Sequence, residues 1–202
     1  MIPIEQIRVR LKGIRPLMLS RGEAANPFDP QTRDIKRVSQ KRKKTDEDHE
    51  LLAYLQFKSA CYFDPEIGIY LPSDNLFKCI QQGAAKFKES PLVKSCVIIK
   101  GFVGKELEIA GARLQYDGPQ GDLDKLYKEK QFVSSVMGMM PGQKTRVLVT
   151  RPIFSNWQAE YQIEFTDLTK ERIMDYLEHA GRMIGIGTWR PQHGLFMPEL
   201  LK

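Results

Sequence analysis

Apolar and charged residues alternate along the first dozen positions of the chain. In an extended chain Ile7, Val9 and Leu11 fall on one face, whereas Arg8 and Arg10 fall on the other. A period of two residues is typical of a strand with one buried face. Residues 2–12 are therefore predicted to form a half-buried strand whose second face is cationic.

The same reading predicts the elements that follow. Apolar residues recur at helical spacing after two hydroxyl residues, Ser73 and Thr169, which suit the N-cap position of a helix. Helices are predicted over 46–62, 73–88 and 169–183. Strands are predicted over 68–71, 93–99, 106–109, 113–116, 144–154, 158–165 and 195–201, with 106–109 and 113–116 forming a hairpin, and with 144–154 joined to the strand after it through a turn at 155–157.

Two segments show no clear period. Residues 21–45 carry Gly22, Pro27, Pro30 and many charges, and they are predicted to form a flexible basic arm. Residues 117–143 are predicted to form an irregular insertion, in which glycine and proline bracket a short helical piece, LDKLYKEKQF, and a Met-rich stretch. Both segments read as excursions from one core.

Removing these excursions leaves a simple order of elements, β-α-β-β-α-β, formed by 2–12, 73–88, 93–99, 158–165, 169–183 and 195–201. This is the ferredoxin-like, or RRM-like, arrangement of the α+β class. Two helices cover one face of an antiparallel sheet and the other face stays open. With 202 residues, the chain is expected to form a single domain over 1–202.

Composition narrows the class of protein. Hydrophobic residues make up 42% and charged residues 28% of the chain, which is typical of globular proteins. No apolar run approaches the ~20 residues that a membrane span needs, and the alternating N-terminus is unlike a signal peptide, so a cytoplasmic location and no membrane contact are expected. Three cysteines without a CxxC pair favour neither a disulfide framework nor a zinc site, and no cofactor or metal is expected.

The positive charge is concentrated in one place. The chain carries 31 Lys and Arg against 25 Asp and Glu, a net charge of +6. Between residues 31 and 44 there are seven basic residues and one acid, which already gives 7 − 1 = +6, so the remainder is neutral. A neutral body with one cationic segment is the usual footprint of a protein that binds a polyanion. The alternative is a solvated loop that is basic for solubility.

Residues 181–196, GRMIGIGTWRPQHGLF, form the second candidate site. Gly185 and Gly187 permit backbone conformations in which a ligand approaches the main chain closely. Trp189 offers a stacking plane, and Arg190 and His193 offer donors to phosphate. The alternative is that the glycines only end the last helix and that the tryptophan packs in the core.

Three stretches resemble a known family. The Ser-capped junction IYLPSDNLFKCI, the strand TRVLVTRPIF and the closing GIGTWRPQHGLF are similar to segments of the repeat-associated RNA-binding proteins, the RAMP superfamily, which form the backbone of CRISPR effector complexes. Members commonly have YIPGSSLKGALR at the junction, where this chain lacks the glycine after proline. The closing segment also resembles small phage and prophage proteins that end in GIG-x-W/Y-RP-x-x-G. The resemblance implies a ferredoxin-like core, an RNA partner and a bacterial or phage-infected cell.

Together these features predict a non-catalytic protein that binds single-stranded RNA or DNA with little sequence preference. It is expected to assemble cooperatively along the strand as a homo-oligomer or filament. The predicted nucleic-acid-binding residues are Arg8, Arg10, Arg33, Lys36, Arg37, Lys41, Arg42, Lys43, Lys44, Gly185, Gly187, Trp189, Arg190 and His193.

Two other functions stay open. Some RAMP proteins cleave RNA with an aspartate in the loop after the first strand. The resemblance therefore implies that Asp29 or Asp34 could serve a metal-dependent endoribonuclease. The alternative is that such an aspartate beside proline only forms a turn, which is its usual role. Alternatively, the chain is a phage protein that docks on a host protein through its basic arm. For Trp157, in the turn at 155–157, contact with a partner and closure of the core are equally favoured. Arg8 and Arg10 have an alternative explanation too, because charged side chains on an edge strand protect it against aggregation.

Overall fold

A computed structural model of the chain describes residues 3–22, 26–108, 111–139 and 146–201. The chain forms two compact units. The first consists of Met1–Leu17, Phe63–Asp117 and Ser155–Lys202, and the second consists of Met18–Tyr62 and Gly118–Phe154. The two predicted insertions, apart from residue 117, therefore belong to the second unit.

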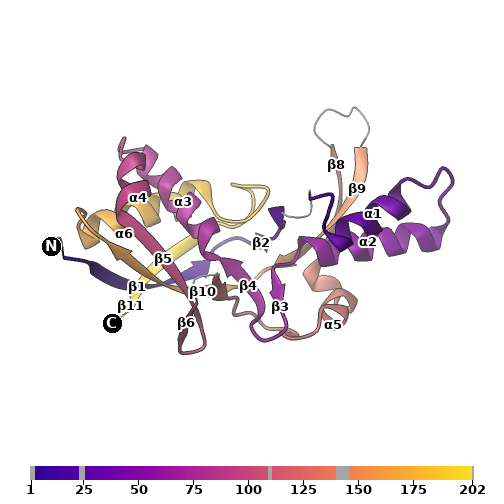
Figure 1. Ribbon diagram of the computed structural model, residues 1–202, viewed down its shortest axis with the longest axis horizontal. Coiled ribbons are helices and arrows are strands. Elements are labelled where there is room, and N and C mark those ends of the chain that lie inside the picture. Colours follow the sequence, from indigo (N-terminus) through magenta and orange to yellow (C-terminus); the bar gives the residue numbers. More distant parts are fainter. Residues whose placement is uncertain (1–2, 23–25, 109–110, 140–145, 202) are drawn as a thin grey trace. The chain divides into compact units, whose positions relative to one another are not determined.

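The first unit is built on an antiparallel sheet with the order β11-β1-β10-β5-β6 (Figure 1). These strands are β1 (Glu5–Gly13), β5 (Val97–Val103), β6 (Glu106–Glu108), β10 (Gln158–Phe165) and β11 (Phe196–Leu201). The four predicted core strands thus lie in the order fourth, first, third, second. The predicted α+β class with antiparallel sheets is confirmed, and the strand order is consistent with the ferredoxin-like arrangement. Because β1 lies between β11 and β10, its charges do not protect an edge.

Helices α3 (Ser73–Ala85), α4 (Ser90–Cys96) and α6 (Lys170–His179) lie on one side of this sheet (Figure 1). The apolar stripes of α3 and α6 are buried, and a π-helical turn, Ala180–Ile184, follows α6. Gly83 allows the two helices to pack closely, since a Cβ there would lie 2.4 Å from the carbonyl oxygen of Tyr176. Thr169 caps α6 as predicted, by accepting a hydrogen bond from the Arg172 amide.

The predicted cap at Ser73 was wrong. Pro72 occupies the N-cap position of α3, and Ser73 is already the first helical residue, with no side-chain cap bond. The predicted strand over 93–99 was also wrong in its first half, because α4 extends to Cys96 and β5 begins at Val97. A short continuous apolar run fits a buried strand and a buried helix equally well.

A second small sheet in this unit has the order β3-β4-β7, formed by β3 (Phe63–Asp64), β4 (Gly68–Pro72) and β7 (Gly111–Arg113). The predicted hairpin between 106–109 and 113–116 was wrong, because β6 pairs with β5 whereas β7 pairs with β4. The residues between β6 and β7 include 109 and 110, which lie outside the described residues. The hydroxyl of Tyr161 on β10 donates to the carbonyl of Leu71 on β4 at 2.8 Å and ties the two sheets together.

The second unit combines helices with a hairpin. Its elements are α1 (Pro30–Ser39), α2 (Asp46–Ala60), α5 (Leu123–Lys128), a 3-10 turn (Lys130–Phe132), β8 (Val133–Met139) and β9 (Arg146–Phe154), and its sheet has the order β2-β9-β8 with β2 at Leu17–Met18. Helix α2 contacts both α1 and β9. The predictions for 21–45 and 117–143 were therefore wrong in part, because α1 occupies the basic arm and β8 occupies the Met-rich part of the insertion, whereas α5 and the 3-10 turn confirm its predicted helical piece.

The predicted partner of β9 was also wrong. Strand β9 pairs along its length with β8, from Arg146 opposite Met139 to Pro152 opposite Val133, whereas β10 belongs to the sheet of the first unit. Residues 140–145, which include the expected start of this strand at 144, lie outside the described part. Within the described residues, no helix is long and apolar enough to cross a membrane.

Candidate nucleic-acid interface

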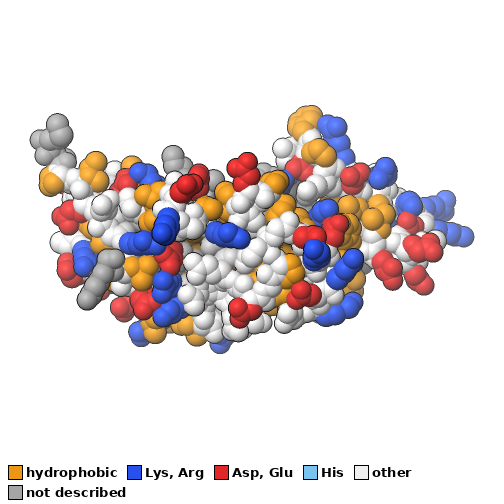
Figure 2. Space-filling model, turned by 90° about the horizontal axis from the view of Figure 1, so that it is seen from below, with side chains coloured by type: hydrophobic (Ala, Val, Ile, Leu, Met, Phe, Trp, Pro, Cys, Tyr) orange, Lys and Arg blue, Asp and Glu red, His pale blue; other side chains and the backbone are white. Residues whose placement is uncertain are grey.

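The cations of the second unit form a basic segment, residues 33–44, at the end of α1 and in the turn before α2. Arg33, Lys36 and Arg37 lie three and four residues apart on α1 and are exposed, which places them on one side of the helix. Lys41, Arg42 and Lys43 are exposed in the turn, and Lys44 is half-buried. Basic side chains gather at this end of the second unit in the surface view, with acidic side chains beside them (Figure 2).

Acidic partners engage only part of this basic segment. Arg37 lies 3.3 Å from Asp34, and Lys41 lies 2.6 Å from Asp48 in α2. The hydrogen bond from Lys41 is the largest cause that lowers the pKa of Asp48. Among the described residues, the structure gives no ion pair to Lys36, Arg42 or Lys43, so their charges are available to an anionic ligand.

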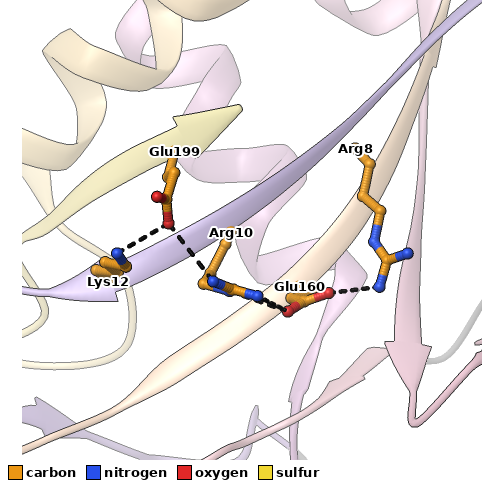
Figure 3. Close-up of polar contacts among 5 residues, drawn as sticks. All are labelled: Arg8, Arg10, Lys12, Glu160 and Glu199. Carbon is orange, nitrogen blue, oxygen red and sulfur yellow. Dashed lines mark hydrogen bonds and ion pairs between the residues drawn. The ribbon is translucent and has the colours of Figure 1, made fainter. Parts of the chain in front are cut away.

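The cations of β1 have a different environment. Arg8 donates to Glu160 on β10 at 2.6 Å, and Arg10 donates to the same carboxylate at 2.9 and 2.7 Å (Figure 3). On the other side Glu199 of β11 lies 2.9 Å from Lys12 and 3.6 Å from Arg10. Three cations and two carboxylates thus form one ladder across three strands, which we call the β1 ladder.

Glu160 is the centre of the β1 ladder and only 7% exposed. Burial by itself raises the pKa of this carboxyl, but the hydrogen bonds from Arg10 and Arg8 outweigh it, and the pKa lies below its usual value. The guanidinium of Arg8 also lies 4.0 Å from the centre of the Phe102 ring. Arg8 and Arg10 therefore already have partners within the sheet. The sequence analysis did not single out Glu160, although its position on an alternating strand was a signal that could have found it.

The loop after α6 is shaped by residues with positive φ. Gly185, Gly187 and Gly194 have φ values of 79°, 86° and 74°, and Trp189 has 56°. The amide of Gly185 closes the π-helical turn by donating to Ala180 at 2.8 Å, while Ile186 donates to Gly194 at 2.9 Å across the base of the loop. The glycines both end the helix and fold the loop back on itself.

Three predicted site residues meet in this loop. Trp189 is 38% exposed, and its ring centre lies 6.2 Å from that of His193. Arg190 donates to Gln82 of α3 at 2.9 Å and to the Gly185 carbonyl at 3.3 Å. Residues 187–191 line an open depression of about 510 Å³ together with residues 82, 183 and 184. A stacking plane and a cation are thus presented on one surface of the first unit.

Trp157 lies in the core, and the interpretation as a partner contact was wrong. It is 2% exposed and its indole N–H donates to the Arg15 carbonyl at 2.9 Å. Its ring covers Gly13 so closely that a Cβ on that glycine would lie 2.3 Å from the indole nitrogen.

Both candidate catalytic aspartates have local partners. Asp29 is the N-cap of α1, accepting from the amides of Gln31 at 2.9 Å and Thr32 at 3.1 Å, and it lies 2.7 Å from Arg21. Asp34 lies within α1 beside Arg37. Asp29 thus starts the helix that carries the first part of the basic segment.

No family model matches this sequence, and no curated protein matches it. Among solved structures, the chain is similar to one in the "Cryo-EM structure of the Type III-B Cmr-beta bound to cognate target RNA", with a TM-score of 0.50 and 12% identity over 98% of this chain and 60% of that chain. Cmr6 from Pyrococcus furiosus gives a TM-score of 0.38 at 10% identity, over 98% of this chain and 100% of its own. Csc2 from Thermofilum pendens gives a TM-score of 0.31 at 10% identity, over 98% of this chain and 65% of its own.

The fold is thus a mixed α+β fold similar to that of the Cmr-beta chain. The chain spans 60% of the length of the Cmr-beta chain. At 12% identity the similarity concerns the fold alone.

Proposed function

We propose that this protein binds single-stranded nucleic acid, with RNA as the preferred ligand, without catalysis and with little dependence on sequence. The fold similarity to a chain of an RNA-bound assembly supports the choice of ligand. The observation that carries the proposal is the exposed basic segment, whose net charge equals that of the whole chain.

Phosphate contacts explain why such a surface favours nucleic acid. The phosphates of a strand carry one negative charge each, and cations that replace their counterions supply most of the sequence-independent affinity. Arg33, Lys36, Arg42 and Lys43 are exposed and placed to do so. Arg8 and Arg10 contribute less, because binding a phosphate would require them to leave Glu160.

The loop at 185–193 is the second contact in this proposal. Trp189 stacks on a base, and Arg190 exchanges its bond to Gln82 for a phosphate. Stacking on an aromatic ring tolerates every base, which fits a binder without sequence preference. Neighbouring copies along one strand raise one another's effective concentration, so the protein assembles cooperatively as an oligomer or filament.

Fluorescence anisotropy with labelled single-stranded RNA, single-stranded DNA and duplex over a salt series tests the proposal. If ~4 to 6 phosphates are neutralised, the plot of log affinity against log salt has a slope of about −3 to −4 for single strands. Single strands bind more tightly than duplex. A slope near zero, or equal affinity for duplex, contradicts the proposal.

The partners of Asp29 and Asp34 support a role without catalysis, since Asp29 is engaged as a helix cap and ion-pair partner. Incubation of labelled single-stranded RNA with the protein and Mg²⁺ is expected to leave the RNA intact. Cleavage that disappears in Asp29→Ala or Asp34→Ala, while binding remains, overturns this part of the proposal.

A further inference from the structure

The second unit contains a pocket of about 660 Å³ between α1, α2 and the β8–β9 hairpin. One wall is a stripe of α2 that includes His49, Leu52 and Gln56, three and four residues apart along the helix. The opposite wall is β9 from Arg146 to Arg151, with Met137 of β8. The volume lies within the range of about 300–1,000 Å³ typical of small-molecule sites.

The lining combines apolar side chains with cations. Apolar side chains come from both walls and from α1, and three cations come from Lys44, Arg146 and Arg151. Among the described residues that line it there is no Asp or Glu, although the first turn of α2 carries three acids. Such a surface complements a ligand that has a flat apolar part and a negative charge attached to it.

The edge of β9 adds backbone groups to this pocket. The Thr150 amide donates to the Gln56 side-chain oxygen at 3.0 Å, and the Pro152 carbonyl accepts from Leu19 at 3.2 Å. Both groups point away from β8. Because backbone groups two residues apart on a strand point to the same side, the amide and carbonyl of Leu148 also face this edge. The pocket therefore offers a main-chain donor and acceptor beside the amide group of Gln56.

We propose that this pocket receives one unstacked nucleobase of the bound single strand, with a neighbouring phosphate held by Lys44 and Arg146. The inference rests on the proposed function. Lys44 links the two sites, since it ends the basic segment and also lines the pocket. A strand bound along the basic segment thus reaches the pocket without leaving the second unit.

The chemistry of the pocket favours a base over a side chain of an acidic peptide. Leu52, Leu148 and Met137 line the pocket and offer apolar contact to the faces of a ring. The Gln56 amide and the β9 backbone supply donors and acceptors that match a base edge. The carboxylate side chain of an acidic peptide would use the cations but has no ring for the apolar side chains to contact.

A homopolymeric uridine strand and an abasic ribose-phosphate strand of equal length test the proposal, because they differ only in the bases. The wild-type protein is expected to bind the uridine strand about tenfold more tightly, with the same salt slope for both strands. Failure to bind either strand contradicts the proposed function itself. Equal binding of both overturns the base pocket together with the stacking on Trp189, and leaves binding through the phosphates standing.

Leu52→Glu and Leu51→Glu then locate the effect. Both substitutions add one carboxylate to α2, but Leu52 lines the pocket whereas Leu51 is 43% exposed and does not. Leu52→Glu is expected to reduce the preference for the uridine strand to the part that stacking on Trp189 supplies, and Leu51→Glu to retain it in full. If circular dichroism shows that Leu52→Glu does not fold, Leu148→Glu replaces it, because Leu148 lines the pocket and is 45% exposed. Its control is Leu107→Glu, since Leu107 is 41% exposed and does not line the pocket. A preference of wild-type size in the folded pocket variant overturns the proposal and leaves the pocket to another occupant, such as an acidic peptide.

Discussion

Replacement of Glu160 by Gln is expected to destabilise the first unit by removing the charge at the centre of the β1 ladder. The side chain keeps its shape and one acceptor, so the change isolates the carboxylate charge. Glu160 is 7% exposed and accepts hydrogen bonds from Arg8 at 2.6 Å and from Arg10 at 2.9 and 2.7 Å. In the variant, two guanidinium groups face a neutral amide.

The contacts set the size of the effect. A hydrogen bond to a charged group contributes about 1.5–3 kcal/mol, whereas an exposed ion pair contributes about 0–1 kcal/mol. The side chains of Arg8 and Arg10 are 42% and 32% exposed, so water screens part of the interaction. We expect a loss of about 2 kcal/mol in the free energy of unfolding, which corresponds to a melting temperature about 4–8 °C lower for a protein of this size.

Thermal denaturation at several pH values measures this difference. The pKa of Glu160 is lower in the folded protein than its usual 4.5, so the carboxylate stabilises the fold above that pH, and the stabilisation is lost as pH falls through the folded-state value. The gap between wild type and Glu160→Gln is therefore full at pH 7 and narrows below pH 4.5. A matched Glu199→Gln variant, whose side chain is 43% exposed, is expected to lose less than about 1 kcal/mol. A gap that is absent at neutral pH, or that persists unchanged in acid, refutes this reasoning.

Two further predictions concern the candidate sites. Gly194→Ala is expected to lower the free energy of unfolding more than Gly104→Ala, as measured by chemical denaturation. Both glycines have positive φ, which costs an alanine about 1–2 kcal/mol, but only at Gly194 would the new Cβ lie 1.8 Å from the Ile186 carbonyl oxygen, whereas Gly104 faces open space. Equal losses in the two variants would contradict the close approach at Gly194. Asp29→Ala is expected to lose about 1 kcal/mol or more of the free energy of unfolding in urea denaturation, because it removes the cap of α1 and the contact with Arg21. Asp29→Asn is expected to lose less, because it keeps a capping oxygen. An Ala variant as stable as the wild type would show that the cap is unimportant.

The sequence predicted the parts of the sheet that obey a simple period. Strands β1 and β10 alternate residue by residue, and one face of each is buried in the structure. The stripe of α6 and its Thr169 cap were equally visible. In each case, local spacing and the buried face of the element agree, so single residues carry enough information.

Pairing between distant segments could not be predicted in the same way. The partner of β7 is β4 and the partner of β9 is β8, and neither choice is encoded in the turn beside the strand. Helix α1 did carry signals, since Asp29 precedes Pro30 at the start and Ile35 and Val38 are three residues apart. The charges around them obscured this period, because seven of the eleven residues from 33 to 43 are basic or acidic, which is typical of a solvated loop.

The candidate site was predictable only in outline. The basic segment and the residues of the glycine loop are evident from composition, whereas the partners of Arg8 and Arg10 depend on a register between β1 and β10 that joins residues 150 positions apart. The pocket beside β9 was not foreseen at all. It is formed by α1, α2 and two strands whose association is decided by packing rather than by local sequence.

The most direct test of the proposed function compares two triple variants in the salt dependence of binding to single-stranded RNA. Replacement of Lys36, Arg42 and Lys43 by Ala removes three exposed cations of the basic segment, and replacement of Lys94, Lys105 and Lys170 removes three exposed cations elsewhere.

Both variants have the same net charge. We expect the first variant to lose about 2 from the magnitude of the log-log salt slope, as follows from three phosphate contacts on a single strand, and the second to keep the wild-type slope. Equal slopes in both variants would contradict it.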